Sequence, residues 1–227
     1  MHHSRRQNPS RRDFLKLSGS VAALGGVGAT LTAFAHNPAA GPDACGPYGE
    51  LVPAVDRTTG LPLLKLPRGF RYASWGWTGD PMSDGTPTPD RHDGMAVVTR
   101  GGSRTKEITL IRNHERGAVP EDAPLPVIGA GRAPVYDGFR VPGGIGGLGG
   151  GTTTLTFRGG ELVDHRASLG GTLVNCAGGP TPWGSWLTCE EVIIRGSHIG
   201  AQDHGYVYEV PGDGTPASAR PIRTMGL

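Results

Sequence analysis

The sequence predicts an all-β fold, and two observations carry this prediction. The chain holds 39 Gly and 20 Pro among its 227 residues, and they punctuate a series of short runs rich in Val, Ile, Thr and aromatic residues. Short β-type runs separated by turn residues are typical of all-β proteins. Outside the N-terminal segment, no stretch has the apolar period of an amphipathic helix. Such a Gly- and Pro-rich composition also raises disorder as an alternative. Four Trp residues and a net charge of only +2 favour a folded chain instead.

The N-terminal segment has the features of an export signal. The paired Arg11 and Arg12 are followed by a hydrophobic dipeptide, a lysine and the mildly apolar stretch Leu17–Ala35. This stretch ends in Ala-Phe-Ala, the small-x-small pattern of a signal-peptidase site. We therefore predict a twin-arginine signal peptide over residues 1–35, with cleavage after Ala35.

The export signal and the charge together define the compartment and the partners that we expect. The apolar stretch is too weakly hydrophobic to match the roughly 20 strongly apolar residues of a spanning helix, so we expect no stable membrane anchor. The protein is predicted to be periplasmic or secreted, with the twin-arginine translocase as its partner during export. Because that route carries folded proteins, it favours a protein that contains a metal or cofactor. The small net charge, with no Lys/Arg block in the mature part, argues against nucleic acid binding.

About 190 residues remain after cleavage, enough for one domain. Residues 36–66 are expected to form an irregular lead-in, and residues 67–227 the β-domain. The Gly159-Gly160 pair predicts a tight turn between two strands. Evenly spaced short strands suit a sandwich, a barrel or a propeller. The strands that we predict are Phe70–Trp75, Gly94–Thr99, Glu107–Asn113, Thr152–Phe157, Glu161–Ala167, Gly171–Asn175, Ser185–Glu190 and Gly205–Val210.

A glycine run, Gly143–Gly151, formally contains the G-x-G-x-x-G pattern of dinucleotide-binding proteins at Gly144, Gly146 and Gly149. That pattern binds a dinucleotide when it follows a strand and opens a helix. Here a proline precedes the run and a β-type segment follows it. We therefore reject a nucleotide site and expect a flexible loop or a close approach of two backbones.

Acidic and histidine side chains gather at the ends of two predicted strands. Asp93 lies at the start of one strand, and Asn113, His114 and Glu115 lie at the end of the next. Binding sites are often built where strand ends and loops meet. Carboxylate and amide oxygens suit Ca²⁺ or another hard cation. Ordinary turn chemistry and a solvated strand end explain the same residues, so the sequence leaves both interpretations open.

Cys189 is followed directly by Glu190 and Glu191, which combines a soft ligand with two hard ones. A thiolate beside carboxylates suits iron or zinc. A disulfide is the competing interpretation, because an exported protein passes into an oxidising compartment. Cys176 lies across a Gly-Pro turn from Cys189, and Cys45 makes the count odd, so at least one cysteine is unpaired within the chain. The residues alone do not decide between the two interpretations.

Six blocks of sequence, in this order, resemble one family of secreted bacterial enzymes, the PhoX-type alkaline phosphatases. The most specific block is N-C-A-G-G-P-T-P-W-G-S-W-L-T-C-E-E. The others are S-R-R-D-F-L-K, R-H-D-G-M, I-R-N-H-E, G-G-T-T-T-L-T-F and H-G-Y-V-Y-E-V. The resemblance covers nearly the whole chain. It implies a six-bladed β-propeller that holds ferric iron and calcium and hydrolyses small-molecule phosphate monoesters.

The resemblance also implies roles for individual residues. Cys189 would be an iron ligand, and Glu190 or Glu191 would complete the iron and calcium shells. Glu115 would bind calcium, and Asp93 is a further candidate metal ligand. The resemblance assigns no catalytic residue within this chain.

Asn113 and His114 would orient the metal ligands. Six blades of four short strands need on the order of 300 residues, so we expect this chain to hold an incomplete set of blades and to be the N-terminal part or a truncated member of the family. We therefore expect it to be inactive or incomplete as a phosphatase. The alternative is a non-catalytic periplasmic β-propeller that binds a metal or another ligand.

Overall fold

The computed structural model is all-β, with no α-helix in the part of the chain that it describes. The signal residues Arg11 and Arg12, the cleavage point after Ala35, and Cys45 lie outside the described residues, as does part of the glycine run. Among the described residues, no helix has the length and apolar character needed to cross a membrane. The described residues are 48–101, 106–125, 128–129, 133–141, 146–196 and 201–226.

The chain divides into two compact units, residues 1–73 and 74–227. In the first unit, β1 (Leu51–Ala54) pairs antiparallel with β2 (Leu64–Pro67), so the segment that was expected to be irregular contains a strand pair. The strand predicted over Phe70–Trp75 is wrong. Its residues have β-type side chains, but the only pairing there is an isolated bridge at Tyr72.

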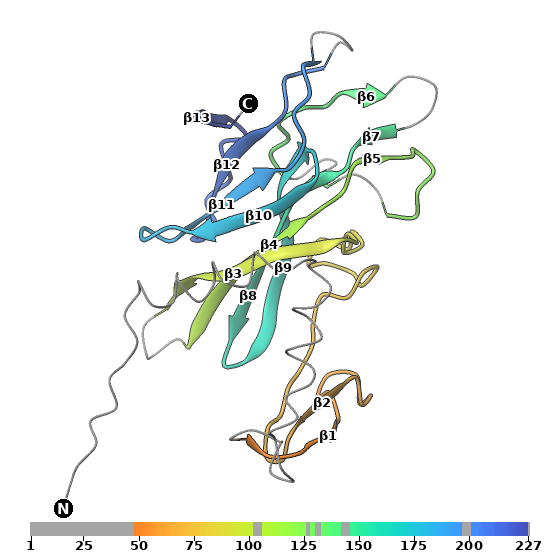
Figure 1. The fold of residues 1–227 in the computed structure, drawn as a ribbon, viewed down its shortest axis with the longest axis vertical. Coiled ribbons are helices and arrows are strands. Elements are labelled where there is room, and N and C mark those ends of the chain that lie inside the picture. Colours follow the sequence, from red (N-terminus) through yellow and green to blue (C-terminus); the bar gives the residue numbers. More distant parts are fainter. Residues whose placement is uncertain are drawn as a thin grey trace, which may run out of the picture. The chain divides into compact units, whose positions relative to one another are not determined.

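The first large sheet of the second unit has four antiparallel strands in the order β3-β4-β8-β9 (Figure 1). They are β3 (His92–Arg100), β4 (Glu107–His114), β8 (Gly150–Arg158) and β9 (Glu161–Thr172). The Gly159-Gly160 pair joins β8 to β9 with positive φ at both residues, 62° and 93°. Two successive left-handed residues form the turn that matches the twist of a hairpin, so the predicted hairpin is confirmed.

The second large sheet has its four strands in sequence order, β10-β11-β12-β13, all antiparallel. They are β10 (Asn175–Pro180), β11 (Ser185–Glu190), β12 (Tyr206–Pro211) and β13 (Pro221–Gly226). The strand predicted over Gly171–Asn175 does not form as one strand: Gly171 and Thr172 end β9, Asn175 begins β10, and Leu173 and Val174 connect the two large sheets. Its left-handed residues at positions 171 and 174 reverse the chain there.

A small third sheet is inserted between β4 and β8, in the order β5-β7-β6. Its strands are β5 (Ala118–Val119), β6 (Arg140–Val141) and β7 (Gly146–Leu148). Gly146 has φ = 95°, and a Cβ at this position would overlap the carbonyl group of Val119. The close backbone approach expected of the glycine run is therefore present at β7.

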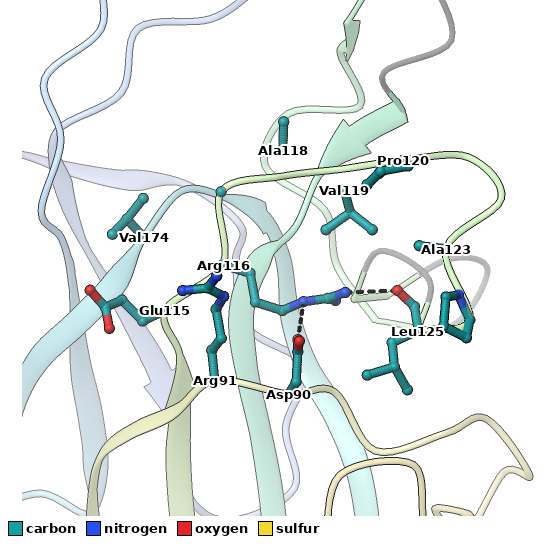
Figure 2. A pocket seen from close by; sticks show the side chains of 12 residues that line it. Asp90, Arg91, Glu115, Arg116, Ala118, Val119, Pro120, Ala123, Leu125 and Val174 are labelled. Carbon is teal, nitrogen blue, oxygen red and sulfur yellow. Dashed lines mark hydrogen bonds and ion pairs between the residues drawn. The ribbon is translucent and has the colours of Figure 1, made fainter.

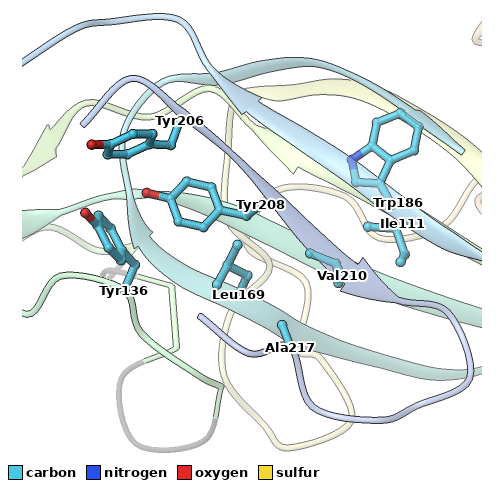
Figure 3. Packing of buried hydrophobic residues seen from close by; sticks show 8 residues of the cluster. All are labelled: Ile111, Tyr136, Leu169, Trp186, Tyr206, Tyr208, Val210 and Ala217. Atoms are coloured by element: carbon cyan, nitrogen blue, oxygen red, sulfur yellow. The ribbon is translucent and has the colours of Figure 1, made fainter. Parts of the chain in front are cut away.

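Buried apolar residues join the two large sheets (Figure 3). Ile111 of β4 and Leu169 of β9 are both 0% exposed, and they pack with Trp186, Tyr208 and Val210 from β11 and β12. Each fully buried side chain of this size contributes about 1.5–3 kcal/mol. In addition, β10 packs against β3 and β4, which brings the strand ends of the two sheets together.

Candidate functional site

Three carboxylates from three strand ends meet where the two large sheets join. Asp93 lies at the start of β3, Glu115 directly follows β4, and Glu191 directly follows β11. The carboxylates of Asp93 and Glu191 both lie within hydrogen-bonding reach of Glu115. Desolvation, and then the charges of Asp93 and Glu191, raise the pKa of Glu115. The structure thus brings together three of the residues that the sequence nominated, and we call them the carboxylate cluster.

The carboxylate cluster has a chemistry that fits a cation, although its geometry is not that of a finished metal site. Like charges held this close destabilise each other, and a cation between them relieves that repulsion. Hard cations such as Ca²⁺ prefer carboxylate oxygens. Within the described ranges, however, no three His, Cys, Asp or Glu side chains already have an arrangement that holds a metal ion.

Two strained backbone positions hold the carboxylate cluster. The Glu115 N–H donates to the carbonyl of Arg91 at 2.9 Å, and the Glu191 N–H donates to the carbonyl of Val174 at 3.0 Å. Arg91 (φ = 51°) and Val174 (φ = 48°) are two of the four described non-glycine residues with positive φ. Such a conformation is rare, above all for a β-branched residue, and strain of this kind gathers at functional sites.

Glu190 points away from the carboxylate cluster and into the protein. Its side chain is 0% exposed. One carboxylate oxygen accepts hydrogen bonds from the Leu173 N–H at 2.9 Å and His204 Nδ1 at 2.7 Å. The other accepts from the N–H groups of Gly205 at 2.7 Å and Tyr206 at 3.1 Å. Neighbouring residues at a strand end face opposite ways. Glu190 therefore fixes the end of β11, while Glu191 joins the cluster.

His204 lies between two carboxylates behind β11, a feature that the sequence reasoning missed. It is 1% exposed, and its ring nitrogens lie 2.7 Å from Glu190 Oε1 and 3.4 Å from Asp137 Oδ2. Burial alone lowers the pKa of His204. The hydrogen bonds and charges of Glu190 and Asp137 outweigh that effect and raise the pKa. Asp137 comes from a long irregular connection, so no local pattern links it to His204.

Cys189 is grouped with Cys176 rather than with the carboxylates. Both are free thiols and both are half-buried. Cys176 lies within a register irregularity of the β10–β11 pair, between Asn175 and Gly178. Burial raises the pKa of Cys189, and the electrostatic interaction with Cys176 raises it further. A raised pKa favours the neutral thiol, so a metal at Cys189 would have to displace its proton.

Asn113 connects the two large sheets beside the carboxylate cluster. It is 0% exposed. Its Nδ2 donates to the carbonyls of Cys176 and Ala177, both at 2.9 Å, and its Oδ1 accepts from Trp186 Nε1 at 2.9 Å. All three partners belong to β10 or β11, whereas Asn113 belongs to β4. Asn113 therefore holds the start of the second sheet against the strand that leads to Glu115.

His114 holds the loop before β3. Its Nδ1 donates to the Asp90 carbonyl at 2.8 Å, and its Nε2 accepts from Thr153 Oγ1 at 2.9 Å. Burial keeps the pKa of His114 well below its ordinary value, so the ring is neutral and makes one bond of each kind. His114 and Asn113 thus position the backbone on both sides of Glu115.

A pocket of about 440 Å³ opens beside Glu115 (Figure 2). Arg116 Nε forms an ion pair with Asp90 Oδ1 at 2.7 Å, and a terminal nitrogen of Arg116 donates to the Leu125 carbonyl at 2.7 Å. Figure 2 shows the Arg91 side chain extending between Glu115 and Arg116. The remaining wall is formed mainly by apolar residues of β5 and the segment after it.

Comparison with known protein families matches two parts of the chain. The model of the family described as alkaline phosphatase PhoX matches residues 46–134 and 150–227, well over half of the chain. The twin-arginine translocation signal sequence matches residues 8–33, which directs the protein to the periplasm or out of the cell. No curated protein and no solved structure matched the chain. The protein is therefore an exported member of the PhoX alkaline phosphatase family.

Proposed function

We propose that the protein is a metal-dependent phosphatase that hydrolyses phosphate monoesters after export, with its site at the carboxylate cluster. The family supports the reaction class. The proposed position of the site rests on the interaction of Asp93 and Glu191 with Glu115, which raises the pKa of Glu115. Glu115 also lines the pocket, so the same side chain faces the cluster and the space that would hold a substrate.

Calcium and iron are the proposed cofactors. Asp93, Glu115 and Glu191 offer only oxygen ligands, which suits calcium. Cys189 is the proposed iron ligand, and its thiol would give up a proton on binding. Glu190 and Asn113 hold the strand ends that carry the proposed ligands.

The chain's own residues supply position and charge to the proposed reaction. When bound, the ions hold phosphate oxygens and offset the charge that develops during hydrolysis. The strained connections at Arg91 and Val174 fix the directions of Glu115 and Glu191 before any ligand arrives. Groups positioned in advance avoid reorganisation during the reaction.

We also propose that the two large sheets are blades of a six-bladed β-propeller. Each has four antiparallel strands, the number that a propeller blade requires. The carboxylate cluster would then lie where the first strands of two neighbouring blades approach each other, because β10 packs against β3.

The test is to measure metal content and p-nitrophenyl phosphate hydrolysis of protein purified from the periplasm, for the wild type and for Glu115→Gln. We expect E115Q to lose bound calcium and to lower kcat by on the order of 100-fold, since it removes charge that holds the ion. Glu161→Gln, an exposed change at the β8–β9 turn, is the matched control and should change neither.

The outcomes separate the candidate functions. Wild-type turnover and calcium content in E115Q would contradict the proposed site. Metal binding by the wild type without turnover of any monoester would favour a non-catalytic metal-binding protein or an inactive member of the phosphatase family. Cys189→Ser should remove iron and leave calcium in place, and retained iron in that variant would refute the role of Cys189.

A further inference from the structure

The pocket beside the carboxylate cluster has room for more than a phosphate group. We propose that it binds the organic part of the ester against an apolar wall, while Arg91 at its edge binds an oxygen of the phosphate. This inference rests on the proposed phosphatase function and adds a substrate class to it. The preferred substrates would be monoesters of aryl or alkyl alcohols rather than of polar polyols.

Arg91 is the cation in this pocket that is free to bind a ligand. Arg116, the other arginine of the lining, is held by Asp90 and by the Leu125 carbonyl. The Arg91 side chain makes no hydrogen bond or ion pair with any residue that the structure describes, and it is exposed. A guanidinium presents five N–H donors in a planar fork that matches phosphate oxygens. Arg91 therefore offers an anion contact next to Glu115.

The backbone at Arg91 fixes the place of this cation. Its carbonyl accepts the Glu115 N–H at 2.9 Å, and its φ of 51° lies in the left-handed region. Strain at a non-glycine residue persists only where the surroundings impose it. The positive side chain of Arg91 and the negative side chain of Glu115 therefore extend from two backbone positions that are hydrogen-bonded to each other. A phosphate placed between these side chains would contact Arg91 directly and would contact the carboxylates through a bound cation.

One wall of the pocket is formed by apolar residues. It comprises Ala118, Val119, Pro120, Ala123, Pro124 and Leu125. Val119 is 6% exposed. A Cβ at Gly146 of β7, or at Gly149 directly after β7, would overlap the backbone or the side chain of Val119. These two glycines therefore allow the chain to pack closely against Val119. Mostly apolar walls with a few polar groups are typical of pockets for small organic ligands, which measure about 300–1,000 Å³.

The test uses phosphonates, which the protein cannot hydrolyse as esters, so binding is measured apart from turnover. Calorimetry compares phenylphosphonate with methylphosphonate on the metal-loaded protein as purified. We expect the wild type to bind phenylphosphonate about 10-fold or more tightly, since an apolar group in such a pocket contributes 10–200-fold. Leu125→Asn should remove most of this difference and leave methylphosphonate binding nearly unchanged.

Arg91→Asn should weaken the binding of both phosphonates by about 10-fold, the loss expected for one charge-assisted contact. Asparagine tolerates left-handed backbone, so this variant should fold, and circular dichroism verifies that. Arg91→Lys should restore part of the affinity. Arg158→Gln, an exposed arginine far along β8 from the pocket lining, is the matched control and should bind as the wild type does.

Each result bears on one proposal or on the other. Equal binding of the two phosphonates by the wild type, or wild-type binding in Arg91→Asn, would overturn the inference about the pocket. Failure to hydrolyse phenyl phosphate and glycerol phosphate, with the phosphonate preferences intact, would overturn the phosphatase function and leave the pocket assignment standing. If both proposals hold, the wild type has a higher kcat/KM for phenyl phosphate than for glycerol phosphate. Leu125→Asn then reduces the difference between the two kcat/KM values.

Discussion

Asn113 joins the two large sheets through buried and partly buried hydrogen bonds. Replacing it with alanine removes the N–H groups that bind two partly buried β10 carbonyls, and it removes the acceptor of buried Trp186 Nε1. Buried groups left unpaired cost about 1–3 kcal/mol each, partly recovered by relaxation and water. We therefore expect Asn113→Ala to lower the free energy of unfolding by about 2–4 kcal/mol in urea denaturation. A loss below about 0.5 kcal/mol, the size of ordinary surface changes, would mean that Asn113 does not join the sheets.

His165 makes folding stability depend on pH. Burial, and then the charge of Arg112, lower the pKa of His165 to about 4. The unfolded chain takes up this proton near pH 6.5, whereas the folded chain resists it, so stability falls as the pH drops from about 6.5 towards 4. The loss is on the order of 2–3 kcal/mol. Burial lowers the pKa values of His92 and His114 as well, which adds to the loss.

His165→Gln should flatten this acid dependence. Glutamine cannot take up the proton, so the difference in melting temperature between pH 6.5 and pH 4.5 should be smaller in the variant than in the wild type. His204 does not obscure the comparison: its raised pKa gives a stabilisation that is complete below pH 6.5 and is lost only as the pH rises through the folded pKa. Parallel curves for the two proteins would contradict the role of His165.

At the scale of elements, the small sheet depends on a glycine with no room for a side chain. Gly146→Ala would place a methyl group on the Val119 carbonyl and push β7 away from β5. Gly214 is a matched control, because its φ of 88° is also left-handed but nothing lies within 4 Å of its Cβ position. We expect Gly214→Ala to cost only the conformational strain, about 1–2 kcal/mol. Gly146→Ala should cost clearly more and should speed hydrogen exchange in β5 and β7. Equal losses would show that β7 shifts freely.

Much of the fold was predictable at this scale, because β-propensity and turn chemistry are local. The hairpin at Gly159-Gly160 and the strands near Asp93 and Glu115 follow from such patterns. Pairing is not local, so Phe70–Trp75 has the composition of a strand without a partner along its length. The strand β13 (Pro221–Gly226) escaped prediction because it begins with proline and only half of its residues are apolar or β-branched.

The candidate site was predictable in part for the same reason. Strand ends point to Asp93, Glu115 and Glu191, which the structure brings together. Strand alternation predicts that Glu190 and Glu191 face opposite ways, but only the fold shows that Glu190 is the one that faces inward to His204. The second carboxylate beside His204 belongs to Asp137, which is far from it in the sequence, so no spacing rule connects the two residues.

At the scale of the whole molecule, export depends on the paired arginines. Replacing Arg11 and Arg12 together with lysine keeps the charge but alters the pair that the twin-arginine match contains. We expect the double variant to accumulate in the cytoplasm as an uncleaved precursor, seen by fractionation and mass spectrometry. A variant with only the exposed Glu161→Gln change should reach the periplasm normally. Mature periplasmic protein from the double variant would contradict this route.

The division of the carboxylate cluster between two sheets also sets an order of events during synthesis. Asp93 and Glu115 belong to a sheet whose last strand ends at Thr172, whereas Glu191 is translated later, with β11. The third carboxylate therefore arrives only after β10 and β11 have been made and have packed against β3. Since the twin-arginine route transports folded chains, this last step takes place before the protein leaves the cytoplasm. The completed carboxylate cluster is therefore exposed to the metal ions of the cytoplasm before it is exposed to those of the periplasm.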